Sequence, residues 1–125
     1  MKSRDGLIRL KRFHVEEKRR QVSQIETMIA EFERMAKELD DQILAEQTRS
    51  GIHDTSHFAY PTFAKAAIQR RDNLLASAAE LKQQLAGAKG EFDAAVEELD
   101  KMQALADRDQ ASEAHEPRAA QGLGR

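Results

Sequence analysis

One break divides the 125-residue chain into two long arms that read as helix throughout. Within the break, Gly51 is a natural helix stop, because glycine readily adopts the left-handed conformation that ends many helices. Pro61 lacks a backbone N–H and is tolerated only in the first turn of a following helix. We therefore predict a helix over about residues 3–50, a turn over about 51–61 and a second helix over about 62–109. Equal arms joined by a short break predict an antiparallel hairpin.

Apolar residues recur every seven positions along the first arm, as in the seam of a coiled coil. The main series is Ile8, Val15, Val22, Ile29, Ala36 and Ile43. Interleaved at steps of three and four are Ile25, Phe32 and Leu39. Met28 and Met35 widen this stripe by one position. Methionine fills irregular gaps in a core, which is the favoured interpretation, and contact with a second partner is the alternative.

The second arm keeps alternating steps of three and four from one end to the other. Its series is Ala64, Ala67, Arg71, Leu74, Ala78, Leu81, Leu85, Ala88, Phe92, Ala95, Leu99, Met102 and Ala106. Many of these side chains are alanine, which allows close helix approach but buries little apolar area. The hairpin is therefore expected to be marginal alone and to become firmer on binding. Facing residues should have numbers that add to about 113 to 114, which places Ile29 beside Leu85 and Leu39 beside Leu74.

Charge is distributed unevenly between the arms. Residues 1–20 hold eight basic and three acidic side chains, and residues 91–116 hold nine acidic and two basic ones. The predicted register lays these two segments side by side. Residues 110–125 show no apolar period and are expected to be a disordered polar tail. The predicted fold is thus all-α, with two long helices forming an antiparallel coiled-coil hairpin over residues 1–109 and a frayed C-terminal tail.

The sequence argues against an enzyme. It shows no phosphate-binding glycine loop, and its carboxylates lie on solvated helix flanks without an apolar pocket that would raise a pKa. There is no cysteine, and the spacing of His53 and His57 by four residues beside a turn makes a poor metal site. We expect no catalytic residue, no cofactor, no metal and no small-molecule substrate. No run of about 18 apolar residues is present, so a soluble intracellular protein is expected.

Three stretches resemble the flagellar export protein FliJ family in its alphaproteobacterial form. They are residues 7–20, 25–39 and 57–66. The resemblance implies a cytoplasmic protein, peripherally associated with the inner face of the cell membrane at the flagellar base. It also implies a role as the stalk of the flagellar export ATPase ring in type III protein export. The membrane export gate protein and export chaperones would be its other partners.

Two groups of residues are candidates for partner binding. The first group is expected to point outward from the open end of the hairpin and to dock in the ATPase ring: Arg9, Arg12, Arg19 and Arg20. The second lies at the turn and is expected to reach the export gate: Phe58, Tyr60 and Phe63. The alternative function is a generic coiled-coil adaptor or oligomerisation protein of another bacterial assembly. Binding to nucleic acid is not expected, because Glu16 and Glu17 interrupt the basic segment and the acidic second arm shields it.

Overall fold

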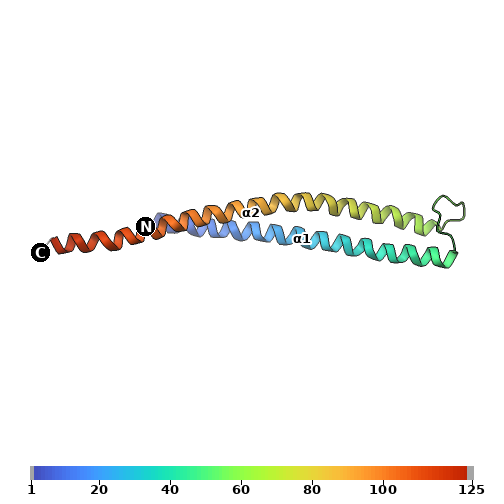
Figure 1. The fold of residues 1–125 in the computed structure, drawn as a ribbon, viewed down its shortest axis with the longest axis horizontal. Helices are drawn as coiled ribbons and strands as arrows, with labels where there is room; N and C mark the ends of the chain where they lie inside the picture. Colours follow the sequence, from blue (N-terminus) through green and yellow to red (C-terminus); the bar gives the residue numbers. More distant parts are fainter. Residues whose placement is uncertain (1, 124–125) are drawn as a thin grey trace. The chain divides into compact units, whose positions relative to one another are not determined.

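The structure is all-α and consists of two long helices, α1 (Lys2–Ser50) and α2 (Thr62–Leu123), that pack against each other as a helical hairpin (Figure 1). The computed structural model describes the backbone of residues 2–123 and the side chains of residues 4–113. No strand occurs within residues 2–123. The predicted start and end of the first helix and the predicted start of the second are confirmed to within one residue.

The predicted end of the second helix, at residue 109, differs from the structure. Helix α2 continues to Leu123, and residues 110–113 are helical with exposed side chains. Without an apolar period, these residues cannot pack against α1. Gln, Ala, Ser and Glu are nevertheless compatible with a helix, so the backbone hydrogen bonds of α2 can continue. The side chains of residues 114–123, and residues 124–125 entirely, lie outside the described part of the chain.

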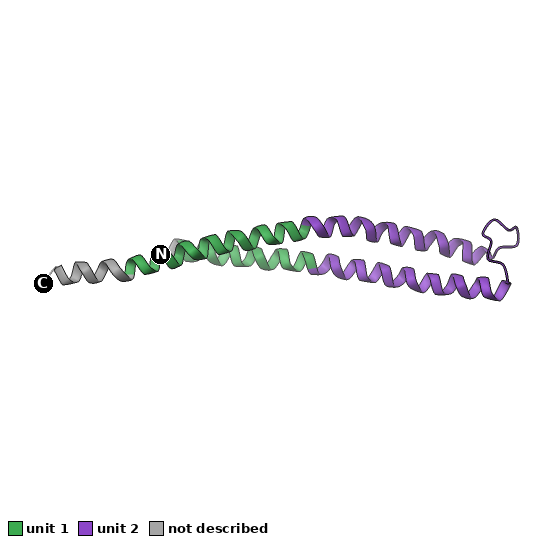
Figure 2. Ribbon diagram, in the orientation of Figure 1, with its two compact units in different colours: residues 1–22, 88–125 green, residues 23–87 purple. Residues whose placement is uncertain are grey.

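The hairpin divides into two compact units, each containing a segment of both helices (Figure 2). Unit 1 combines residues 1–22 with residues 88–125, and unit 2 is residues 23–87, including the turn. Each unit is described separately below.

The heptad positions predicted from the sequence form the core in both units. In α1 the buried members are Ile8, Val15, Ile29, Ala36 and Ile43, and Val22 is half-buried. In α2 the buried members are Ala64, Ala67, Ala78, Leu81, Ala88 and Ala95. The remaining predicted positions of α2 are half-buried. Buried alanines at this spacing let the two helix backbones approach closely, which confirms the alanine-rich seam.

The expectation that both methionines fill the core is wrong for Met28. Its side chain is 45% exposed, whereas Met35 is half-buried. Both methionines directly precede a buried seam residue and so lie at the edge of the seam, where a side chain can be covered or left open.

Polar contacts between the helices test the predicted register. In unit 1 the residue numbers of the ion pairs Arg4–Asp109, Lys11–Glu98 and Lys18–Glu91 add to 113, 109 and 109. In unit 2 those of Glu33–Lys82 and Asp40–Arg71 add to 115 and 111. These values agree with the predicted 113 to 114 to within about one helical turn, the distance that long side chains span. Two predicted neighbour pairs each line a common groove of unit 2: Ile29 with Leu85, and Leu39 with Leu74.

Candidate functional site

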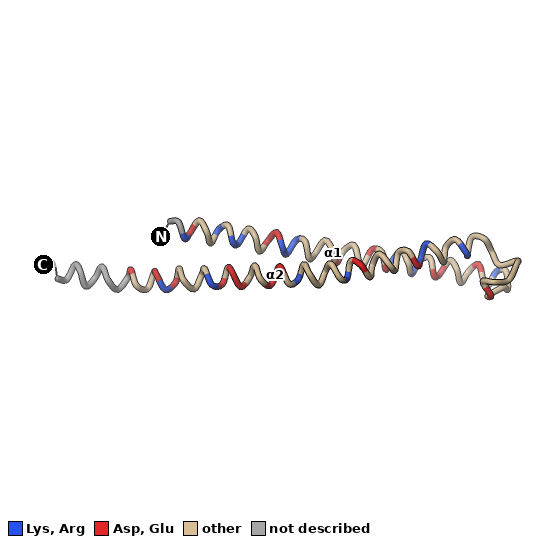
Figure 3. The backbone as a smooth tube through the Cα atoms, turned by 90° about the horizontal axis from the view of Figure 1, so that it is seen from above, with Lys and Arg blue, Asp and Glu red and all other residues tan. Residues whose placement is uncertain are grey.

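In unit 1 the basic segment of α1 lies beside the acidic segment of α2, as predicted (Figure 3). Arg4 pairs with Asp109, and the Nζ atoms of Lys11 and Lys18 lie 3.8 Å and 3.6 Å from carboxylate oxygens of Glu98 and Glu91. Arg4 also donates a hydrogen bond to the Leu105 carbonyl oxygen at 3.2 Å. These carboxylates are partly or largely exposed, so each pair contributes at most about 1 kcal/mol. The pairing therefore fixes the register more than it stabilises the fold.

Two of the four arginines predicted to point outward instead engage α2. Arg12 donates a hydrogen bond from Nη2 to the side-chain oxygen of Gln103 at 3.2 Å. The guanidinium carbon of Arg19 lies 5.3 Å from the centre of the Phe92 ring, and its Nε is 3.4 Å from a Glu16 carboxylate oxygen. Each arginine follows a buried seam residue by four positions, which places it on the same side of α1 at the edge of the seam. Both side chains nevertheless remain exposed, so the contacts with α2 occupy these guanidinium groups without removing them from the surface.

Arg9 and Arg20 are exposed. Neither forms an ion pair with any residue between Arg4 and Glu113, the range over which side chains are described. These two cations are therefore open to a partner, as the sequence predicted for them.

The turn of unit 2 is ordered by its own polar groups. Gly51 has φ 76° and donates its N–H to the Gln47 carbonyl oxygen at 2.9 Å, which ends α1. Asp54 Oδ1 accepts hydrogen bonds from the Ser56 hydroxyl at 2.7 Å and from the Ser56 N–H at 2.9 Å. These two hydrogen bonds, the hydroxyl one foremost, hold the pKa of Asp54 below its ordinary value. The ring Nδ1 of His57 accepts the Ala59 N–H at 3.0 Å, so the turn is built on local hydrogen bonds.

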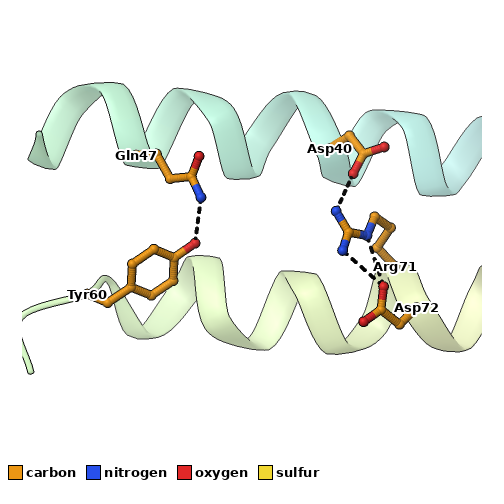
Figure 4. Close-up of polar contacts among 5 residues, drawn as sticks. All are labelled: Asp40, Gln47, Tyr60, Arg71 and Asp72. Carbon is orange, nitrogen blue, oxygen red and sulfur yellow. Dashed lines mark hydrogen bonds and ion pairs between the residues drawn. The ribbon is translucent and has the colours of Figure 1, made fainter. Parts of the chain in front are cut away.

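The three aromatic residues predicted to bind at the turn have different environments. Phe58 is 96% exposed and stacks on His57, with ring centres 4.8 Å apart. Phe63 is 56% exposed, whereas Tyr60 is 7% exposed. The Tyr60 hydroxyl accepts a hydrogen bond from Gln47 Nε2 at 2.9 Å, so this side chain attaches the turn to α1 (Figure 4).

Tyr60 is therefore not a free partner contact, and its prediction as one is wrong. Tyr60 lies two residues before α2 begins, so helix periodicity does not place it, and its burial follows from the path of the turn and its hydrogen bond with Gln47.

Arg71 is a charged member of the predicted seam, and it is accommodated by paired carboxylates. Its Nη1 lies 2.8 Å from Asp40 Oδ1 across the two helices, and its Nη2 lies 3.0 Å from Asp72 Oδ1 (Figure 4). Hydrogen bonds to Asp40 first, and to Asp72, raise the pKa of Arg71 above its ordinary value. This arrangement satisfies the guanidinium at the edge of the seam.

Sequence reasoning missed an exposed apolar group on α1 in unit 1. Leu7, Leu10 and Phe13 are 45%, 60% and 57% exposed. Their spacing of three residues, outside the heptad series, is the signal that could have revealed them.

The arrangement offers surfaces for binding. Among residues with described side chains, no group of three His, Cys, Asp or Glu residues is placed to hold a metal ion. Neither helix, over residues 2–123, contains an apolar stretch of the length needed to cross a membrane. Comparisons with protein-family models, curated proteins and solved structures find no match to this chain.

Proposed function

We propose that the protein is a non-enzymatic coiled-coil component of the flagellar type III protein export apparatus. In this role it acts as the stalk of the export ATPase ring and couples the ring to the export gate and to export chaperones. Its place in the cell is the cytoplasmic face of the membrane at the flagellar base. The observation that carries the proposal is the pairing of two long helices along a heptad seam, combined with the three stretches that resemble the FliJ family.

The ring contact is assigned to unit 1. Arg9 and Arg20 are exposed and have no ion-pair partner within residues 4–113, so they can meet carboxylates of the ATPase without first losing an internal contact. Arg12 and Arg19 are secondary contributors, because a partner would compete with Gln103 and Phe92 for their guanidinium groups. Charge contacts of this kind accelerate encounter and weaken as salt rises.

The gate contact is assigned to the turn of unit 2. Phe58 exposes nearly its whole ring, and Phe63 exposes about half of its surface. Large exposed aromatic side chains are the residue class that most often anchors a protein interface. The hydrogen bonds of Asp54, His57 and Tyr60 hold the turn in one conformation, which lowers the entropy lost on binding.

The test is the turnover of the purified flagellar export ATPase of the same organism, with and without this protein. We expect stimulation that saturates near about one chain per six ATPase subunits, as expected for one stalk in a closed ring. Replacing Arg9 and Arg20 by glutamate should abolish stimulation at low salt. A matched control replaces the exposed Lys37 and Lys65 of unit 2 by glutamate, so the net charge of the chain changes by the same amount. Equal stimulation by both variants, or no stimulation by the natural chain, would refute the stalk function.

An adaptor or oligomerisation function is the second candidate, and exposed Met28 favours it. This methionine adjoins the seam but is 45% exposed in the single chain. A second helix packed beside the seam would cover it. Light scattering at high protein concentration distinguishes the candidates. Self-association that Met28→Lys abolishes would support the adaptor, and a monomer at all concentrations would count against it.

A further inference from the structure

Helix α1 carries a short apolar surface that the hairpin itself does not use. Leu7, Leu10 and Phe13 follow one another at steps of three residues, which places them along one side of the helix. They are 45%, 60% and 57% exposed, although the adjacent seam residue Ile8 is 6% exposed. These three residues are called the outer ridge. Exposing three large apolar side chains in succession is costly for an isolated protein, so the outer ridge is suited to an interface.

Charge around the outer ridge is positive on balance, because exposed Glu17 stands against two arginines. Arg9 precedes Phe13 by four residues and Arg20 follows it by seven, so both adjoin Phe13 on the helix surface. Arg9 also lines the groove between the helices, beside Asp107 of α2. Both arginines are exposed and have no ion-pair partner within residues 4–113. A partner that covers the outer ridge therefore also meets two available cations, and carboxylates placed beside its apolar residues would satisfy them.

Three kinds of partner could cover the outer ridge. A second copy of the chain is disfavoured, because facing outer ridges would bring like charges together and would bury far less than the roughly 800 Å² per partner of a stable interface. An anionic membrane is disfavoured because exposed Glu17 lies one turn beyond Phe13 on the same side, which limits the apolar run to about two turns. A short amphipathic helix matches both the length and the charge.

We propose that the outer ridge is a docking site for a short amphipathic helix of a partner protein, whose apolar stripe is flanked by glutamate or aspartate. The partner's apolar residues pack over Leu10, between Leu7 and Phe13, and its carboxylates pair with Arg9 and Arg20. This inference goes beyond the stalk function and does not require it, because it concerns a helix captured by the isolated hairpin.

The test measures binding of the full-length chain to a fluorescein-labelled synthetic helix by fluorescence anisotropy. The probe has about 18 residues, or about five turns, with one leucine stripe and glutamate on both flanks. A second probe carries lysine in place of glutamate, and a third places the same residues in a scrambled order. Vesicles of phosphatidylcholine with about one-quarter phosphatidylglycerol test the membrane alternative.

We expect saturable binding of the acidic probe, with a dissociation constant in the range of tens of micromolar, as for small transient interfaces. Leu10→Ser should weaken it by about tenfold, because a buried leucine is lost from the contact. Arg9→Glu should weaken it by about fivefold at low salt and less at high salt. The control is Leu44→Ser, since Leu44 is 59% exposed on α1 in unit 2, and it should leave the affinity unchanged.

Either of two results would overturn the proposal. One is equal affinity for the glutamate and lysine probes, and the other is unchanged binding when all three outer-ridge residues are replaced by serine. Vesicle binding that depends on the outer ridge, without binding of the acidic probe, would assign the surface to a membrane instead. Circular dichroism of each variant verifies the helix content. Because the assay contains no ATPase, its failure is distinguishable from failure of the stalk function.

Discussion

Gly87 and Gly90 provide a sharp test of what stabilises α2. Both lie in the helix interior with helical backbone angles, and a Cβ added at either position would meet nothing within 4 Å. Replacing each by alanine should therefore raise the free energy of unfolding by about 0.5 to 1 kcal/mol, because alanine loses less backbone entropy on folding. An added Cβ at either position meets no neighbouring side chain, so the double variant should gain about 1 to 2 kcal/mol.

The measurement is urea unfolding followed by helical circular dichroism. With a slope of about 2 kcal/mol/M, the double variant should unfold at a midpoint about 0.5 to 1 M higher, with unchanged slope. Gly51→Ala is the matched control, because the same substitution is expected to change stability in the opposite direction there. It also has open space around it, but its φ of 76° places alanine in the left-handed region, so stability should fall by about 1 to 2 kcal/mol. A loss of stability in Gly87→Ala would refute the reasoning.

Three further predictions concern single side chains of unit 2. Tyr60→Phe should lower the free energy of unfolding by about 1 kcal/mol in urea titrations, because the partly buried Gln47–Tyr60 hydrogen bond is lost. The hydrogen bonds to Asp54 stabilise the turn fully above its ordinary pKa of 3.8 and are lost as pH falls through the lower folded-state value. The amide resonance of Ser56 should therefore titrate below pH 3.8 and should stop titrating in Asp54→Asn. Ile29→Ala should cost about 2 kcal/mol in thermal unfolding, because Ile29 is 7% exposed in the seam.

The fold could be predicted largely because it depends on local rules. The heptad series specifies which side of each helix is buried, and Gly51 and Pro61 specify where the chain leaves and re-enters helix. The end of α2 could not be predicted from the apolar period. A helix can continue on backbone hydrogen bonding beyond its last packed residue, and packing periodicity carries no information about that.

The candidate site was less predictable because residue type does not determine where a flexible side chain points. Arg12 and Arg19 have the same chemistry as Arg9 and Arg20, but their place at the seam edge gives them partners on α2. Tyr60 is buried beside exposed Phe58 and Phe63 because the turn directs it toward Gln47 of α1, which residue type does not reveal. Position relative to the seam is thus the property that separates internal contacts from surfaces open to partners.

The ion pairs of unit 1 can test whether position relative to the seam determines which side chains pair within the hairpin. Lys18 occupies an interleaved seam position, and its Nζ lies 3.6 Å from a Glu91 carboxylate oxygen that is largely exposed. A double-mutant cycle on Lys18 and Glu91 should give a coupling energy of about 0.2 to 1 kcal/mol in low salt, falling toward zero in about 1 M salt.

The same cycle between Lys18 and the exposed Glu97, six residues along α2 from Glu91, should give no coupling at either salt concentration. Exchanging the charges, as Lys18→Glu with Glu91→Lys, should recover most of the stability that either single change removes. Coupling of Lys18 to Glu97 in place of Glu91 would show that the two helices of unit 1 pair in a different register. In that case the assignment of Arg9 as an open cation would also be wrong, since Arg9 lines the groove that faces Asp107 of α2.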